Sequence, residues 1–220
     1  MTPEHRSARV VPMGEIAVSE ALTFWTAPHP AWRPNPEWPE DVGFVSWCTC
    51  DACVLIDPLV RDDLDSAAWA QFDREVEDAQ SVVVLLTAPW HERSMRAVMA
   101  RYDAAVWIHP DGRDRAGNPR PVVDLPAGID VFVPGGMSEG QVAFHIVDER
   151  ALVVAEFFLG TGGGGLRIAD APSMESREAF VASLQELTAW PIDHVLCVHG
   201  PPVLSTGSEA IREALSAYRG

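Results

Sequence analysis

The sequence predicts an α/β protein in which sheets are covered by helices. Two observations lead to this prediction. Short apolar runs alternate with segments of helical periodicity along most of the chain, and hydrophobic residues make up 47% of its 220 residues, enough for a buried core. The length suits one domain. We therefore expect a single domain over 1–220, in which 1–41 is a Pro- and Trp-rich N-terminal segment.

A hairpin is the first predicted element. Its arms, 44–50 and 53–57, are rich in β-forming residues and flank the turn Asp51-Ala52. Residues 62–79 follow, with apolar side chains at helical spacing and acidic residues in the first turn. The further strands expected are 81–87, 104–109, 129–133, 141–147, 151–157 and 194–198, and the further helices are 95–102, 176–188 and 208–218.

The acidic composition argues against several classes of partner. The 32 acidic residues outnumber the 16 basic ones, which gives a formal net charge of −16. A field of this sign repels phosphate backbones and anionic lipid, so we expect neither nucleic-acid nor membrane-surface binding. No apolar run reaches the roughly 18 residues of a membrane span. The N-terminus also lacks the apolar stretch of a signal peptide, so a cytoplasmic protein is expected.

The N-terminal segment is unusual in its prolines and tryptophans. Residues 28–39 are expected to form an extended loop, because each Pro fixes φ and withholds a hydrogen-bond donor. Trp25, Trp32, Trp38 and Trp47 lie in or near this segment. They could line a flat apolar substrate site or form a homodimer contact, since aromatic residues are enriched at interfaces. Packing on the protein's own core is the favoured interpretation.

Six segments resemble, in order, the motifs of the metallo-β-lactamase fold superfamily. They are 54–58 (VLIDP), 81–87 (SVVVLLT), 104–110 (AAVWIHP), 133–140 (VPGGMSEG), 151–159 (ALVVAEFFL) and 195–200 (VLCVHG). The resemblance runs from about residue 42 to the C-terminus and implies the four-layer αββα sandwich of that superfamily. The loop 90–93 (WHER) and the glycine-rich segment 158–167 are similar to segments of a poorly characterised branch, which implies a retained pocket but supplies no substrate.

The resemblance also implies that most metal-binding histidines of the superfamily are replaced in this chain. Thr87 matches the Thr before the family's His-x-His-x-Asp-His motif, which places at the four ligand positions Ala88, Trp90, Glu92 and Arg93. Gly136 takes the position of the later loop His and Glu156 that of the bridging Asp, whereas the closing His is retained as His199. A paired zinc centre is therefore not expected.

The remaining polar residues leave two interpretations of the pocket. In the first, which the sequence favours, no cofactor binds, and Arg93 pairs with Glu92 or Glu156 to fill the vacated site. In the second, one Zn, Mn or Fe ion is held by Glu156 and His199, and His91 or Glu92 acts as general base toward water. The other residues expected in the pocket are Trp90, Arg93, Gly136 and Asp57.

Three functions stay open on the sequence alone. The protein is slightly favoured as hydrolase-like, acting on an ester, thioester or lactone; the alternative is a catalytically inactive binding or assembly protein that keeps the fold. A redox protein would use Cys48, Cys50 and Cys53, although buried small apolar side chains are favoured over a disulfide or metal clip. The run 162–165 lacks a second nucleotide-binding signature and is expected to be a mobile loop near the pocket mouth.

Overall fold

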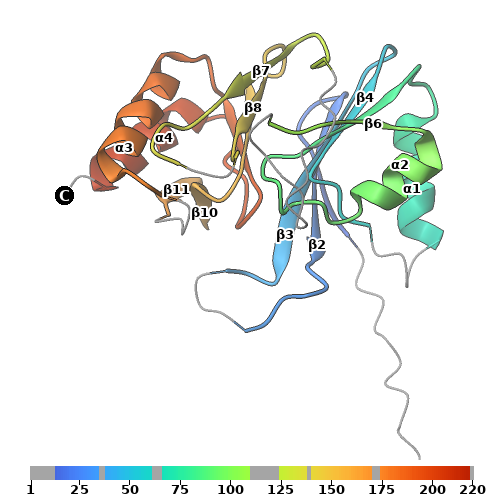
Figure 1. Ribbon diagram of the computed structural model, residues 1–220, viewed down its shortest axis with the longest axis horizontal. Helices are drawn as coiled ribbons and strands as arrows, with labels where there is room; N and C mark the ends of the chain where they lie inside the picture. Colours follow the sequence, from blue (N-terminus) through green and yellow to red (C-terminus); the bar gives the residue numbers. More distant parts are fainter. Residues whose placement is uncertain are drawn as a thin grey trace, which may run out of the picture.

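The computed structural model describes residues 13–34, 38–60, 66–109, 124–137, 140–169 and 174–218. Within these ranges two sheets lie face to face, and helices cover the outer face of each sheet (Figure 1). The four layers are those of the αββα sandwich expected from the sequence.

The first sheet has six strands in chain order, from β1 to β6. They are β1 (Gly14–Ala17), β2 (Leu22–Pro28), β3 (Asp41–Cys48), β4 (Cys53–Ile56), β5 (Val82–Leu85) and β6 (Ala105–Trp107). β1 to β4 pair antiparallel, whereas β4, β5 and β6 are parallel. Successive side chains alternate between the faces of a strand, so Phe44 packs toward the helices and Val45 toward the second sheet.

The second sheet has four strands in the order β12-β9-β8-β7. They are β7 (Ile129–Phe132), β8 (Ala143–Ile146), β9 (Ala151–Val154) and β12 (His194–Cys197). β12 runs parallel to β9, and the other two pairings are antiparallel. A separate hairpin follows β9 and consists of β10 (Phe158–Gly162) and β11 (Gly165–Ile168).

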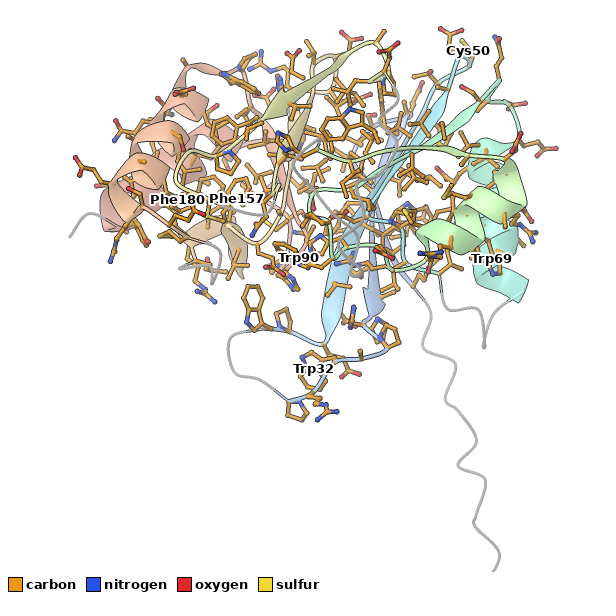
Figure 2. The ribbon with its side chains drawn as sticks, in the orientation of Figure 1. Trp32, Cys50, Trp69, Trp90, Phe157 and Phe180 are labelled. Atoms are coloured by element: carbon orange, nitrogen blue, oxygen red, sulfur yellow. A yellow bond between two sulfur atoms is a disulfide. The ribbon has the colours of Figure 1, made fainter. Side chains whose placement is uncertain are left out.

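Three apolar clusters hold the layers together. α1 (Ser66–Val76) and α2 (Met95–Tyr102) cover the first sheet, where the rings of Trp25, Phe44 and Phe72 stack with centroids 5.8–6.1 Å apart. α3 (Arg177–Leu184), the 3-10 turn η1 (Gln185–Ala189) and α4 (Gly207–Tyr218) cover the second sheet. Figure 2 shows Trp69 in the first helical layer and Phe157 and Phe180 at the opposite end of the sandwich.

The N-terminal segment belongs to the first sheet, which the sequence analysis did not predict. β2 pairs along its whole length with β3, and Leu22, Phe24 and Trp25 are fully or almost fully buried. Trp25 thus packs on the protein's own core, as favoured. The described part of the loop after Pro28 has no helix or strand before β3 begins, which agrees with the extended loop expected there.

Most predicted elements are confirmed, with shorter bounds. The hairpin of β3 and β4 is present, and α2 matches its expected range. The helix expected at 62–79 is described as Ser66–Val76, with 61–65 outside the described residues and no acid in its first turn. The glycine run expected as a loop forms the turn between β10 and β11.

The cysteines differ from the favoured expectation. Cys48 and Cys53 lie opposite each other in the β3–β4 hairpin and form a disulfide, while Cys50 at the turn is an exposed thiol. Cys197 lies in the other half of the sandwich, and burial raises the pKa of its thiol to about 12. Cys197 therefore does not join the other three in one cluster.

Among the described residues no helix is both long and apolar enough to span a membrane.

Candidate functional site

The candidate site lies where strands of both sheets end. In the first sheet Asp57 follows β4 directly, and the chain from β5 continues beside it to Thr87. In the second sheet Glu156 and His199 each lie two residues beyond their strands, β9 and β12. Because the paired strands are parallel in both cases, their carboxyl ends meet at one edge and bring these side chains together.

Asp57 anchors the first half of the site. Its buried carboxylate accepts hydrogen bonds from the Thr87 backbone N–H at 2.9 Å and from the Thr87 hydroxyl. It also accepts one from His91 Nδ1 at 2.9 Å. Because His91 Nδ1–H donates this hydrogen bond to Asp57, the orientation of the ring is fixed. The other ring nitrogen, Nε2, faces the pocket.

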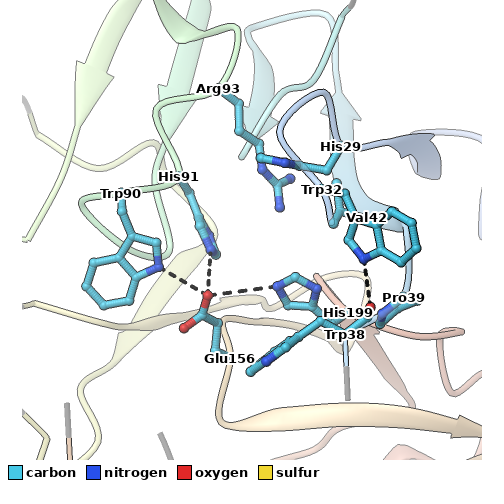
Figure 3. A pocket seen from close by; sticks show the side chains of 10 residues that line it. All are labelled: His29, Trp32, Trp38, Pro39, Val42, Trp90, His91, Arg93, Glu156 and His199. Carbon is cyan, nitrogen blue, oxygen red and sulfur yellow. Dashed lines mark hydrogen bonds and ion pairs between the residues drawn. The ribbon is translucent and has the colours of Figure 1, made fainter. Parts of the chain in front are cut away.

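Glu156 joins the two halves of the site (Figure 3). Its Oε1 lies 3.6 Å from His91 Nε2 and 3.9 Å from His199 Nε2, and it accepts a hydrogen bond from Trp90 Nε1 at 3.2 Å. One ligand atom from each of His91, Glu156 and His199 lies within 4.8 Å of the other two. Two imidazole nitrogens and one carboxylate oxygen are a donor set that divalent zinc, manganese and iron accept.

The pKa values of the two histidines are shifted in opposite directions. Burial opposes a charge on His91, but the carboxylates of Asp57 and Glu156 outweigh it and raise the pKa of that ring. Burial likewise lowers the pKa of His199, and the interaction with Glu156 does not reverse the shift. Burial would raise the pKa of Glu156, yet the two histidines and Trp90 hold it well below its usual range. Without a metal, the two carboxylates therefore favour the charged form of His91.

Arg93 forms the upper wall of the site in Figure 3. Its NH1 donates to the backbone carbonyls of Gly43 at 2.8 Å and Asp57 at 3.0 Å. Arg93 and Asp57 have φ of 34° and 52°, in the left-handed region that costs free energy for residues other than glycine. Strained backbone at two touching residues is common where a structure holds functional groups in place.

A pocket of about 300 Å³ opens in front of these groups. Its apolar wall consists of Trp32, Trp38, Pro39, Val42 and Trp90, and its polar wall of His29, His91, Arg93, Glu156 and His199. Trp32 Nε1 donates to the Trp38 carbonyl at 2.9 Å, which ties the loop to itself, and the Trp38 ring meets His199 edge-on at 4.6 Å between centroids. Two tryptophans of the N-terminal segment thus line the pocket.

The structure brings together some of the residues expected at the site and separates others. Glu92 lies outside the pocket, in the turn before α2, with its carboxylate 4.0 Å from Arg96. Gly136 packs against the start of α3, where its carbonyl accepts from the backbone N–H of Glu175 and Ser176. The interpretation in which Arg93 pairs with Glu92 or Glu156 is not the contact observed, because Arg93 donates to backbone carbonyls.

Close backbone approaches position His199 and its loop. Gly43 N donates to the Val198 carbonyl at 2.7 Å, and a Cβ at Gly43 would lie 2.4 Å from the Cys197 carbonyl. On the other side Gly160 N donates to the His199 carbonyl at 3.0 Å, and a Cβ at Gly160 would lie 1.8 Å from the Pro201 carbonyl. The sequence analysis gave neither glycine a role, although the absence of a Cβ is the signal that a close approach leaves.

Comparisons with known proteins agree with this architecture. No family model matches the sequence, and no curated relative matches it. A metallo-β-lactamase from Pontibacter korlensis superposes with a TM-score of 0.71 at 12% identity, covering 95% of this chain and 100% of that one. A metallo-β-lactamase from Erythrobacter litoralis gives 0.66 at 14% identity, with 94% and 92% covered. FIM-1 from Pseudomonas aeruginosa in its mono-zinc form gives 0.65 at 10% identity, with 94% and 96% covered. The protein therefore has the metallo-β-lactamase fold.

Proposed function

We propose that this protein is a hydrolase that uses one divalent metal ion, held by His91, Glu156 and His199, to cleave an ester, thioester or lactone. The observation that carries the proposal is the convergence of these three ligands at the floor of an aromatic pocket. Hydrolysis adds water across the acyl bond and releases an acid together with an alcohol or thiol. The mono-zinc state of FIM-1, a protein of the same fold, is a precedent for one ion in such a site.

The spacing of the donors supports one metal ion. Two ligands at about 2.1 Å from a tetrahedral zinc lie roughly 3.4 Å apart. The separations from Glu156 Oε1 to the two imidazole Nε2 atoms are 3.6 and 3.9 Å, close to this value, and the three ligand atoms all lie within 4.8 Å of one another. The Nδ1 atom of His199 is buried and has no hydrogen-bond partner among the described residues. No hydrogen bond from that atom therefore constrains the ring within the described part of the chain.

The residues next to the three metal ligands have defined parts in this proposal. A metal ion bound here would supply a hydroxide near neutral pH and polarise the acyl carbonyl. Asp57 keeps the Nδ1 proton on His91, so that Nε2 offers its lone pair to the ion. Trp90 keeps the Glu156 carboxylate in place through its indole N–H. Glu92, expected as a general base, is not among the residues that line the pocket and receives no part.

A second candidate function also has a specific observation in its favour. Asp57, His91 and Glu156 contact one another in sequence without any metal, and the two carboxylates raise the pKa of His91 between them. A protein that keeps the fold but binds a ligand without turnover would retain such a unit. On this alternative, added metal neither binds in stoichiometric amount nor changes ligand affinity.

Elemental mass spectrometry on untagged protein, purified without chelator, tests the proposal. We expect about one equivalent of zinc, manganese or iron, lost in Glu156→Gln and in His199→Ala. The matched control is Glu92→Gln, which removes the same charge beside the site but outside the pocket. Metal below stoichiometry that none of the three variants changes would overturn the metal site and favour the non-catalytic function. Turnover of an ester, thioester and lactone panel, present in Glu92→Gln and absent in the other two, completes the test.

A further inference from the structure

Three tryptophans form the pocket walls on two sides of the ligand cluster. Figure 3 shows Trp90 on one side of His91 and Glu156, and Trp32 and Trp38 on the other. Trp90 is held by Glu156, and Trp32 and Trp38 are held to each other, so the walls are fixed before any ligand enters. Flat indole faces around a space of about 300 Å³ suit a flat apolar ring system.

Arg93 places a guanidinium over the same space. Both of its hydrogen bonds within the described residues come from NH1 and go to backbone carbonyls. Its Nε and NH2 groups have no hydrogen-bond partner among those residues, and the side chain lines the pocket. A guanidinium with donors to spare beside a pocket is suited to receive a carboxylate, which it can bind with two parallel bonds.

The charge of the protein makes Arg93 the group that would attract an anionic ligand to this pocket. The net charge of −16 repels carboxylates in general. Among the described residues that line the pocket, Arg93 is the arginine and Glu156 is the carboxylate. A divalent ion held by Glu156 would offset the charge of that carboxylate and leave the guanidinium to receive a negative charge on a ligand.

We infer that the pocket binds a small monocarboxylate with a flat apolar ring system, the ring between Trp90 and the pair Trp32 and Trp38, and the carboxylate on Arg93. The inference deepens the proposed function, on which it rests for the reaction that the bound ligand would undergo. It names the substrate class as an ester, thioester or lactone of a flat cyclic acid that also carries a free carboxylate. Its recognition by Arg93 and the tryptophans does not itself require turnover.

Binding of 2-naphthoate and of its neutral analogue 2-naphthamide tests the inference. Both probes have the same ring system, and only one carries a charge. We measure their dissociation constants by isothermal titration calorimetry and by quenching of tryptophan fluorescence, on zinc-loaded protein and on protein treated with chelator. We expect naphthoate to bind at least about tenfold more tightly than naphthamide, since a hydrogen-bonded charge is worth that much.

Two arginine variants test whether Arg93 causes the preference for naphthoate over naphthamide. Arg93→Gln is expected to bring the two dissociation constants to within about threefold of each other, by loss of naphthoate affinity alone. Arg96→Gln is the matched control, because it removes the same charge from a side chain that is 79% exposed on α2, and it should bind both probes as the wild type does. Trp90→Phe should weaken both probes together. If Arg93→Gln fails to fold, the comparison of the two probes on wild-type protein still decides whether the pocket prefers a carboxylate.

The outcomes separate this inference from the proposed function. Equal affinities for the two probes, or a preference for naphthoate that survives in Arg93→Gln, would overturn the inference even if a metal ion is bound. A preference that depends on Arg93, in a protein that takes up no metal and hydrolyses none of the panel, would support the inference and overturn the proposed hydrolysis. Absence of binding by either probe overturns the inference alone.

Discussion

The two halves of the site differ in how firmly their side chains are held. On the side of the first sheet, Asp57 accepts hydrogen bonds from Thr87 and His91 and is fully buried. On the side of the second sheet, Glu156 and His199 approach each other only at 3.9 Å, and the Nδ1 atom of His199 has no partner among the described residues. The first half is therefore fixed by the fold, whereas the second half has room to respond to a ligand.

This difference suits a site that binds a metal ion. A preformed half presents one imidazole in the correct tautomer, and an adjustable half completes the coordination sphere. The difference also separates stability from function. Substitutions in the first half should unfold the protein, and those in the second half should remove ligand binding from a folded protein.

Asp57→Ala is expected to have the largest effect of the four substitutions considered for this comparison. The change leaves the Thr87 backbone N–H and the His91 Nδ1–H without their acceptor in a buried place, which costs about 3–5 kcal/mol of unfolding free energy. Urea denaturation followed by circular dichroism measures the loss. The control is Asp73→Ala, since the carboxylate of Asp73 is paired with Arg101 at the surface and should cost far less. Equal losses in the two variants would show that the first half is not the rigid one.

Gly160→Ala tests whether backbone contact, instead of side-chain bonding, fixes the second half. A Cβ at this position would lie 1.8 Å from the Pro201 carbonyl, so the loop that carries His199 must shift, at a cost of about 1–3 kcal/mol. Gly163→Ala, in the turn between β10 and β11, has nothing within 4 Å of the added methyl group. The alanine would only have to adopt a left-handed backbone conformation, which costs about 1 kcal/mol of unfolding free energy. Thermal melts of both variants compare them, and a smaller loss at 160 than at 163 would contradict the expected clash.

Glu156→Gln should cost about 1 kcal/mol of stability or less. The amide oxygen can still accept the hydrogen bond from Trp90, and the side chain is 19% exposed, so solvent compensates for part of the lost charge. Urea denaturation of metal-free protein measures the change. A loss as large as that of Asp57→Ala would remove the distinction between the two halves.

His145 can be compared with His91, because it is also buried but has no hydrogen bond to a carboxylate among the described residues. Burial lowers the pKa of His145, and its Nε2 atom is buried with no partner among the described residues. The unfolded chain therefore binds a proton near pH 6.5 before the folded protein does, so stability should fall as the pH drops below about 6.5. His145→Gln should reduce this acid-side slope in urea denaturation between pH 7.5 and 5. An unchanged slope would assign the dependence to other groups.

Much of the fold follows from local sequence patterns. The run Val82–Leu85, the helix Met95–Tyr102 and the hairpin around Asp51 were predictable, because periodicity and turn residues agree there. β1 and β2 were not predicted, because the prolines predicted a loop for 28–39 and no element was assigned to the residues before it. The hairpin of β10 and β11 was missed because its glycines are typical of a loop, although here they serve its turn and its contact with the His199 segment.

The site was predictable in part. Glu156 and His199 follow buried strands whose order matches the superfamily, and their convergence agrees with the sequence prediction. The resemblance placed Glu92 at a ligand position and left His91 or Glu92 as the general base. The chain turns at 88–94, which directs His91 inward and Glu92 toward Arg96. His29 and Trp38 lie in the pocket because β2 and β3 bring their loop there, and no local pattern reports such a tertiary contact.

Gly43 has a consequence for how this protein can change over evolution. Its carbonyl accepts from Arg93, its N–H donates to Val198, and a side chain would collide with Cys197 and with the ring of Phe24. One residue thus links the strand after the aromatic loop, the guanidinium and the segment that carries His199. We expect that orthologous sequences keep glycine at this position wherever the segment of Cys197 and Val198 lies against β3, because any side chain there would force the two sheets apart beside the site.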